Sequence, residues 1–490
     1  MNILFIYSLQ EIETSQRPLR SPELLQFGIS YISAVLKESG HSTRLVVLSR
    51  STEAKKNKRI IDKYIADFKP KLICFTAVSS EYGFISGIAG YIKKAHKDIY
   101  LFIGGVHVTL NPDGILNDAF DALCIGEGEL PTLELVERLG NNTPPSGIAN
   151  LWIKNSSQIE KNNPRPFLEN LDTLPHLDRE MWREWIIIGQ QPLRQAVLLG
   201  RGCPFECTYC CNHALKKISP GKYVRLRSTE KIAEEIRKVA NEFPDTREIY
   251  LEVETFYIDK DWALDLCAKL EELNRDLIKP LAFGVNLRVT PNTDYEALFK
   301  ACSRGNFRFI NIGLESGSER IRSLVLKRNY SNQDIINTVD SARRHKLQVA
   351  FFNMIGVPGE TFEDFKQTLS MNRICLPDWV MTCIYFPYPG TDLYSLCKEK
   401  GLLGADIDTE MERSRVNLDL PGFSRKQIKH NYDWFYYHVY KGKRPTSGIL
   451  LRVLASKLRA WSKLFQLYLW LRRNSVYASL KSSLQKSADF

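Results

Sequence analysis

The sequence predicts an α/β protein with an N-terminal doubly wound parallel sheet, a partial (β/α)6 barrel and a helical C-terminal region. Three observations lead to this prediction. Short apolar runs alternate with helical patterns over residues 1–140 and again over 195–395, and strands that alternate with helices pair in parallel sheets. A loop-rich segment, residues 141–194, separates these stretches, and the pattern of residues 396–490 is helical. The length of 490 residues suits two or three domains.

The first 140 residues supply the doubly wound sheet. Its predicted strands are residues 3–7, 44–48, 71–77, 100–103 and 121–125. Helical periodicity is clearest at residues 27–36 and 60–68. In such sheets ligands bind at the carboxyl ends of the strands. The residues expected to bind a ligand there are Thr76, Ser79, Gly104, Gly105, His107, Gly126, Glu127 and Gly128.

Residues 141–194 differ in character from the stretches around them. Residues 141–147 read Asn-Asn-Thr-Pro-Pro-Ser-Gly, a composition typical of a loop. A hairpin is predicted around residues 151–153. We therefore interpret this segment as a linker with some structure of its own.

Residues 195–395 contain six strand–helix units, as in a partial barrel. The predicted strands are residues 196–199, 249–253, 282–287, 309–314, 349–357 and 381–386. Ser228 is a predicted N-cap, and two helix starts match the capping-box pattern, Ser331 with Asp334 and Thr361 with Asp364. As in complete barrels, chemistry is expected at the carboxyl ends of the strands.

Cys203, Cys207 and Cys210 directly follow the first barrel strand, where a catalytic group is expected. Three thiols this close together can bind one metal centre from a single loop. An iron–sulfur cube normally takes four cysteines, so a cube that is held by three keeps one iron open to another ligand. The adjacent Cys211 has no assigned role.

A zinc site is the alternative, with His213 as a fourth ligand. Against it, the sequence has no second Cys-x2-Cys pair. Disulfides fit less well, because the cysteines are crowded and nothing marks the chain as secreted.

The composition excludes other classes of protein. Hydrophobic residues make up 44% of the chain, too many for a disordered protein. Residues 1–7 lack a basic leader and resemble a first strand rather than a signal peptide. No apolar run is long enough to span a bilayer, and eleven scattered cysteines suit a reducing compartment. We therefore expect a cytoplasmic protein.

The Cys-x3-Cys-x2-Cys spacing, with the aromatic Tyr209 before the last cysteine, resembles that of the radical S-adenosylmethionine enzymes. The resemblance covers about residues 195–395. It implies that the three cysteines hold a catalytic [4Fe-4S] cluster and that Tyr209 lies at the cofactor site.

Residues at the ends of later barrel strands also resemble those of the radical S-adenosylmethionine enzymes. It implies that Glu254 binds the amino group of S-adenosylmethionine through a charge-assisted hydrogen bond. A related subgroup has Asp-Asp-x-Phe there, and this chain departs from it with Val253. Arg288, Glu315 and Ser316 match residues that line the nucleotide site in the family. Arg288 either binds the methionyl carboxylate or forms a structural ion pair with Glu315, and both readings stay open. Residues 355–360 are similar to the loop that passes under the adenine.

The first 140 residues resemble the cobalamin-binding domain that precedes this barrel in one large subgroup. The glycines at 104, 105, 126 and 128 let the backbone approach a bulky corrin. A dinucleotide site would need Gly-x-Gly-x-x-Gly after the first strand, where residues 7–10 read Tyr-Ser-Leu-Gln. No Asp-x-His-x-x-Gly run is present, so the resemblance implies cobalamin without a protein histidine on cobalt. A degenerate, cofactor-free domain is the alternative.

The resemblance implies a radical reaction. The cluster would cleave S-adenosylmethionine to a 5′-deoxyadenosyl radical that removes hydrogen from an unactivated carbon, and methylcobalamin would then supply a methyl group. An oxidative cyclase is the alternative outcome. An RNA methylthiotransferase fits less well, because only Cys74 and Cys124 precede residue 200. A metal- or corrin-binding module without catalysis is the last alternative.

The expected partners are a small-molecule or lipid substrate and an electron donor such as flavodoxin or ferredoxin, with no nucleic acid. The net charge of +11 is concentrated in the tail, where residues 447–490 hold eight Lys or Arg and one acid. Leucines and aromatics between these charges are typical of a helix at a membrane surface. A helix that packs its apolar face on the barrel is the alternative.

Overall fold

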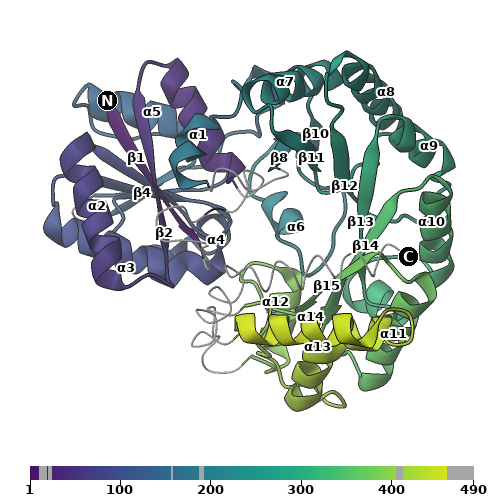
Figure 1. The fold of residues 1–490 in the computed structure, drawn as a ribbon. Helices are drawn as coiled ribbons and strands as arrows, with labels where there is room; N and C mark the ends of the chain where they lie inside the picture. The colour runs from purple at the N-terminus through teal and green to yellow at the C-terminus, as the bar shows by residue number, and fades with distance from the viewer. Residues whose placement is uncertain (10–18, 20–24, 156–157, 187–192, 404–411, 461–490) are drawn as a thin grey trace. The chain divides into compact units, whose positions relative to one another are not determined.

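The computed structural model describes all residues except 10–18, 20–24, 156–157, 187–192, 404–411 and 461–490 (Figure 1). The chain divides into two compact units. The first contains residues 1–286, 300–308 and 388–395, and the second contains residues 287–299, 309–387 and 396–490. The predicted α/β class is confirmed: a sheet with five parallel strands comes first, and a second parallel sheet follows.

The N-terminal sheet has seven strands in the order β2-β1-β3-β4-β5-β6-β7. Five strands are parallel: β1 (Asn2–Leu9), β2 (Ser42–Ser49), β3 (Leu72–Thr76), β4 (Tyr100–Gly104) and β5 (Ala122–Cys124). The antiparallel hairpin of β6 (Leu151–Lys154) and β7 (Ile159–Lys161) extends this sheet beyond residue 140. The helices are α1 (Phe27–Glu38), α2 (Ala54–Phe68), α3 (Ser79–Ala95), α4 (Val106–Leu110) and α5 (Glu129–Gly140), with a short 3-10 turn η2 (Asp113–Ile115). Figure 1 shows α1 and α5 on one face of the sheet and α2 and α3 on the other.

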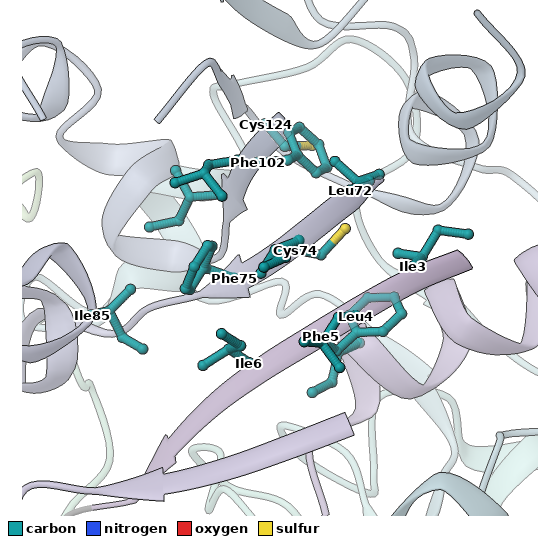
Figure 2. Close-up of a cluster of buried hydrophobic side chains, with 14 of the residues drawn as sticks. Ile3, Leu4, Phe5, Ile6, Leu72, Cys74, Phe75, Ile85, Phe102 and Cys124 are labelled. Carbon is teal, nitrogen blue, oxygen red and sulfur yellow. The ribbon is translucent and has the colours of Figure 1, made fainter. Parts of the chain in front are cut away.

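The core of this sheet follows from its strand register. Phe5 of β1 pairs with Cys74 of β3, which pairs with Phe102 of β4, so these side chains lie in one row on one face. All three are at most 4% exposed. Figure 2 shows them among a cluster of buried hydrophobic side chains. Phe75 points to the other face and packs edge-on against Phe120 at 5.5 Å between ring centroids. Because helices cover both faces, these strands are nearly continuous apolar runs, as is usual for buried parallel strands.

The second sheet contains the six parallel strands that the sequence predicts for the partial barrel, in the order β15-β14-β13-β12-β11-β8. They are β8 (Leu193–Leu198), β11 (Thr246–Glu252), β12 (Ala282–Leu287), β13 (Phe307–Glu315), β14 (Gln348–Ile355) and β15 (Trp379–Ile384). The helices are α7 (Thr229–Glu242), α8 (Lys260–Asp276), α9 (Glu296–Arg304), α10 (Asn332–Arg344) and α11 (Phe362–Cys375). Both predicted capping boxes are present, at Ser331 and Thr361, and the Ser228 side chain caps α7.

Shorter elements complete the chain. They are the 3-10 turns η3 (Leu171–Thr173) and η4 (Glu180–Trp185), the antiparallel pair β9 (Gly200–Arg201) and β10 (Arg225–Leu226), α6 (Cys211–Leu215), η5 (Ile321–Val325), α12 (Asp392–Glu399), α13 (Arg425–Tyr440) and α14 (Thr446–Ala460). The predicted helical C-terminal region is present up to residue 460, and the rest of the basic tail lies outside the described residues. Among the described residues, no helix meets the length and hydropathy needed to cross a membrane.

Helix α14 packs on α13 through only part of its surface. Ile449 and Val453 are buried, whereas Leu450, Leu451 and Leu454 are 43%, 37% and 54% exposed. One face of α14 therefore packs on protein, whereas Leu450, Leu451 and Leu454 are exposed, and contact with a membrane stays a prediction.

A buried ion cluster ties α7 to β8 in the first unit. Glu235 is 2% exposed and accepts hydrogen bonds from Arg179 at 2.9 Å and Arg227 at 2.6 Å. The two guanidinium groups also donate to the carbonyls of Ala196 and Leu198 on β8. Burial alone would raise the pKa of Glu235, but the charges of Arg179 and Arg227 hold that pKa below its ordinary value. This carboxylate therefore compensates two buried cations.

We expect Glu235→Ala to lower the free energy of unfolding by about 3–5 kcal/mol, because it leaves two buried guanidinium groups without their anion. Chemical denaturation of the purified protein measures this loss. The neighbouring Glu234→Ala is the matched control, since Glu234 is exposed and should contribute little. Equal stability of the two variants would contradict the role assigned to the cluster.

Gly105 forms the tight turn between β4 and α4. Its φ is +103°, and a Cβ atom there would lie 2.8 Å from both the Ala77 carbonyl oxygen and Thr76 Oγ1. Only glycine fits this combination of left-handed backbone and close approach. The turn therefore fixes the backbone at the carboxyl ends of β3 and β4.

Gly105→Ala is expected to destabilise the protein by at least about 1 kcal/mol, because alanine is strained at positive φ and meets backbone atoms. Gly87→Ala in α3 is the control, because its Cβ would enter open space on a helix and should be neutral or stabilising. Thermal or denaturant unfolding distinguishes the two. A Gly105→Ala protein as stable as Gly87→Ala would show that the turn is not constrained.

Candidate cluster and corrinoid site

The three predicted cluster cysteines lie in the loop between β9 and α6. Burial, together with the charges of Glu254, Cys207 and Cys210, raises the pKa of Cys203 to about 11, so these groups are electrostatic neighbours. Among the residues that the structure describes, no group of three or more His, Cys, Asp or Glu side chains is gathered closely enough to hold a metal ion. The three sulfur atoms are therefore neighbours on one loop rather than a formed tripod.

The last cysteine is surrounded by hydrogen-bond donors. The Cys211 thiol donates to Cys210 and is the main reason that the pKa of Cys210 falls to about 7. The backbone and side-chain amides of Asn212 also point at the Cys210 sulfur, at 3.5 and 3.7 Å. Tyr223 donates to the Asn212 carbonyl at 2.6 Å and so orients its amide. This environment favours a thiolate, the form that binds iron.

His213 fixes the backbone of the loop. Its Nδ1 lies 2.8 Å from the Cys210 carbonyl oxygen, and its Nε2 lies 2.9 Å from an Asp392 carboxylate oxygen. The Leu393 amide donates to the Thr208 carbonyl at 2.9 Å, which holds the segment around Asp392 on the loop. Both ring nitrogens of His213 thus face other groups, and the zinc alternative lacks its expected fourth ligand.

Glu254 follows β11 and is exposed beside the cysteine loop, since its charge acts on Cys203, Cys210 and Tyr223. Glu252 is the last residue of β11, two positions before Glu254. Burial and then the charge of Glu254 raise the pKa of Glu252 to about 7. Of these two carboxyl groups, Glu254 is the exposed one and is therefore accessible to a cation.

The other predicted barrel residues lie in the second unit. Glu315 has a φ of +59°, and its carboxylate pairs with Arg328 at 3.0 Å. The two predicted roles of Arg288 stay predictions. Arg288 makes a long contact, 3.4 Å, to the Lys327 carbonyl. Ser316 is fully buried, and its hydroxyl accepts from the Ser318 amide at 3.2 Å. Ser316 thus stabilises the turn that follows β13.

The predicted 355–360 loop is held by a buried carboxyl group. Glu360 is fully buried and accepts hydrogen bonds from the amides of Gly356 at 2.6 Å and Val357 at 3.2 Å. Burial raises its pKa to about 8. The loop is therefore fixed by its own side chain.

An apolar cavity of about 230 Å³ opens at the carboxyl ends of β3, β4 and β5. We call it the apolar cavity. Its lining residues include Phe5, Ile29, Ile32, Cys74, Thr76, Phe102, Gly104, Gly105, Cys124, Gly126, Glu127 and Gly128. Six of the eight residues predicted for the N-terminal ligand site are thus brought together. The apolar lining, with glycines at the ends of β4 and β5, fits a bulky organic ring.

A second cavity of about 250 Å³, here called the shared cavity, is lined by the glycine loops and by residues that precede and follow the cysteine loop. The glycine loops contribute Gly105 and Gly126, and the cysteine-loop side contributes Gly202 and Tyr223. Both cavities lie within the first unit. A ligand in the shared cavity would contact the N-terminal loops and the start of the cysteine loop at once.

Ser79 and His107 do not line either cavity. Ser79 Oγ lies 3.0 Å from His107 Nδ1, and the His107 ring packs on Tyr82 at 4.6 Å between centroids. Burial lowers the pKa of His107. The two contacts hold the His107 ring between α3 and α4, and its predicted role as something other than a cobalt ligand stays a prediction.

Glu127 lines the cavities but is already occupied. Its carboxylate accepts two hydrogen bonds from Arg225, at 3.0 and 2.9 Å, one from Arg201 at 3.0 Å and one from the Leu168 amide at 2.9 Å. Arg201 also pairs with Glu129. Burial opposes ionisation of Glu127, but Arg225 and Arg201 hold its pKa below the ordinary value. Sequence analysis missed both arginines, and the adjacency of Arg201 to the cysteine loop was the available signal.

Two family models match the chain. The Radical SAM superfamily model matches residues 197–371, and the B12 binding domain model matches residues 21–136. These ranges contain the cysteine loop and the glycine loops described above.

The chain is 27% identical over 379 residues to an uncharacterised methyltransferase of Pyrococcus horikoshii, an alignment that covers 77% of this chain and 79% of that one. It is 23% identical over 384 residues to the anaerobic magnesium-protoporphyrin IX monomethyl ester cyclase of Rubrivivax gelatinosus, covering 76% of this chain and 66% of the cyclase.

The fold is similar to that of the radical S-adenosylmethionine methyltransferase TsrM from Kitasatospora setae, solved with cobalamin and a [4Fe-4S] cluster bound. The TM-score is 0.67 at 15% identity, and the match covers 91% of each chain. The predicted family is confirmed: the chain belongs to the radical S-adenosylmethionine enzymes that carry an N-terminal B12-binding domain.

Proposed function

We propose that this enzyme methylates an unactivated carbon of a small-molecule or lipid substrate. The observation that carries the proposal is the shared cavity, which is lined by the glycine loops and by the start of the cysteine loop. A substrate there would contact the glycine loops and Gly202, the residue before Cys203, which suits transfer of a methyl group to a substrate radical. The similarity to two methyltransferases supports the same assignment.

The roles of the site residues are part of this proposal. Cys203, Cys207 and Cys210 hold the cluster, and Tyr209 flanks it. Glu254 binds the ammonium group of S-adenosylmethionine. Arg288, Glu315 and Ser316 shape the nucleotide end of that site. When bound, the cluster supplies the electron that cleaves S-adenosylmethionine, and cobalamin supplies the methyl group. The protein itself binds, orients and excludes water.

Thr76, Gly104, Gly105, Gly126 and Gly128 are proposed to contact the corrinoid through the apolar cavity. Glu127 contributes by fixing its loop, because its carboxylate is fully engaged by arginines. Ser79 and His107 support this site indirectly, because their hydrogen bond joins α3 to α4.

Oxidative cyclisation is the second candidate function, favoured by the similarity to the cyclase. Both reactions begin with hydrogen abstraction by the same radical, and they differ in whether a methyl group leaves the corrinoid.

We also propose a small acidic electron donor such as flavodoxin or ferredoxin. The exposed Lys216 and Lys217, at the end of α6, are suited to bind it.

We expect anaerobically reconstituted protein to be brown, to hold about four iron atoms per chain and to form 5′-deoxyadenosine from S-adenosylmethionine and a reductant. Replacing Cys203, Cys207 or Cys210 by alanine should abolish both properties, because each removes a cluster ligand. Cys211→Ala is the matched control and should keep the iron. Iron analysis and chromatography measure these outcomes.

Zinc in place of iron, or a brown chromophore that survives all three substitutions, would contradict the cluster assignment. Label from the S-adenosylmethionine methyl group that enters the product only with cobalamin present supports methylation. An unlabelled, oxidised product supports cyclisation instead.

We further propose that the protein works in the cytoplasm and contacts an anionic membrane surface through α14 and residues 461–490. The exposed Leu450, Leu451 and Leu454 lie beside Arg452, and the tail from residue 447 carries a net charge of +7. Apolar and basic side chains on one helix favour the interface of an anionic bilayer.

Leu450→Glu with Leu454→Glu should reduce co-sedimentation with vesicles of phosphatidylglycerol and phosphatidylcholine several-fold, because the substitutions remove apolar insertion and add negative charge. Ile278→Glu is the control, since Ile278 is 98% exposed and lies in the first unit. Unchanged sedimentation of the double variant, or equal binding to purely zwitterionic vesicles, would contradict membrane contact.

A further inference from the structure

Asn212 contacts the sulfur of the last cysteine in the loop through two different groups. Its backbone nitrogen lies 3.5 Å from Cys210 Sγ and its side-chain nitrogen lies 3.7 Å from the same atom. The backbone contact is the cap of α6, since Cys210 is the N-cap residue of that helix. Any residue at position 212 except proline can make this cap. The side-chain contact is additional and depends on the residue being asparagine.

Tyr223 determines which end of the Asn212 carboxamide faces the sulfur. Its hydroxyl donates to Asn212 Oδ1 at 2.6 Å, and both side chains belong to residues that are at most 9% exposed. A carboxamide has its acceptor oxygen at one end and its two N–H donors at the other. With the oxygen engaged by Tyr223, the N–H groups are turned toward Cys210. The reverse orientation would place a carbonyl oxygen against the sulfur and lose both interactions.

Tyr223 is itself held by contacts that do not involve the cysteine sulfurs. Its ring packs on Phe167 at 5.1 Å between centroids, and its carbonyl oxygen accepts from Arg225 Nε at 3.2 Å. Gly202 has a φ of +86°, and a Cβ atom there would lie 2.3 Å from the same carbonyl oxygen. All of these residues belong to the first unit. The hydroxyl of Tyr223 therefore has a fixed place from which it orients Asn212.

We propose that Asn212, oriented by Tyr223, sets the reduction potential of the iron–sulfur cluster by donating a side-chain hydrogen bond to the Cys210 thiolate. Both are positioning residues, because neither binds iron and each acts through another group. The inference rests on the proposed function, since it presupposes that Cys210 is a cluster ligand.

The direction of the effect follows from charge. One-electron reduction adds one negative charge to the cluster and its thiolates, takes up no proton, and uses an electron from the acidic donor proposed above. An N–H group that points at a ligand sulfur stabilises the more negative state and so raises the potential. Hydrogen bonds to charged groups are stronger than those between neutral groups. Asn212 thus makes the cluster easier to reduce and a weaker donor of the electron that it passes on.

The test measures the midpoint potential of the cluster in the full chain after anaerobic reconstitution. Dithionite with redox mediators reduces the protein stepwise, and the electron paramagnetic resonance signal of the reduced cluster reports the extent. Asn212→Leu keeps a similar size but removes the side-chain donor. We expect it to lower the equilibrium constant for reduction at least tenfold, a shift of about 59 mV to more negative potential for a one-electron couple.

Tyr223→Phe removes a single oxygen atom and leaves Asn212 in place but free to turn. We expect a shift in the same direction and of smaller size. It also decides the question by itself if Asn212→Leu does not fold. Tyr91→Phe is the matched control, because it removes a hydroxyl that donates to Asp62 at 2.7 Å between α3 and α2, and it should leave the potential unchanged.

Iron analysis separates the possible outcomes. An unchanged potential in both Asn212→Leu and Tyr223→Phe, at full iron content, overturns the tuning while the cluster assignment stands. Loss of iron from both variants would show that the pair holds the loop, which also overturns the tuning. If the unsubstituted protein takes up no iron, the cluster assignment and the tuning both fail.

Discussion

The carboxylate of Glu127, paired with Arg225 and Arg201, is the interaction on which the candidate site depends. It joins the loop that ends β5 to the segment that leads into the cysteine loop, since Arg201 stands two residues before Cys203. Arg225 is only 3% exposed, so its charge must be compensated within the protein. Taking such a cation out of water is costly unless its hydrogen bonds are satisfied, and here Glu127 and the Leu168 carbonyl satisfy them. The pairing thereby fixes one wall of the shared cavity.

The glycine loops and the cysteine loop prepare the site for its ligands by different physical means. On the N-terminal side, glycines remove side chains so that a large ring can approach the backbone, and the turn at Gly105 depends on a positive φ. On the cysteine side, donors gather around one sulfur, with Asn212 held by Tyr223 and His213 held by Asp392. One half provides space and the other provides a fixed electrostatic environment. Radical chemistry needs both, because the reactive species must be close to its target and shielded from water.

The structure adds contacts that the motifs do not show. Glu127, predicted to bind the cofactor, lines the apolar cavity and pairs with two arginines. Ser316, predicted at the nucleotide site, accepts a hydrogen bond from the Ser318 amide in a buried turn. The Glu315 carboxylate pairs with Arg328, which carries no motif of its own. In each case the sequence indicated the residue but not its hydrogen-bond or ion-pair partner. The partner comes from a distant part of the sequence or from a position that no spacing rule marks.

The sequence by itself determined the order of strands and helices, the capping boxes, the glycine turns and the cysteine loop, because each depends on residues close together along the chain. The hydrophobic period, the cap side chains and the thiol spacing are all local. Only the tertiary structure decided that Arg225 closes on Glu127, that His213 faces Asp392 and that Phe5, Cys74 and Phe102 form one apolar row. Those contacts depend on strand register and on the compensation of buried charge, which bring together residues that are far apart in the sequence.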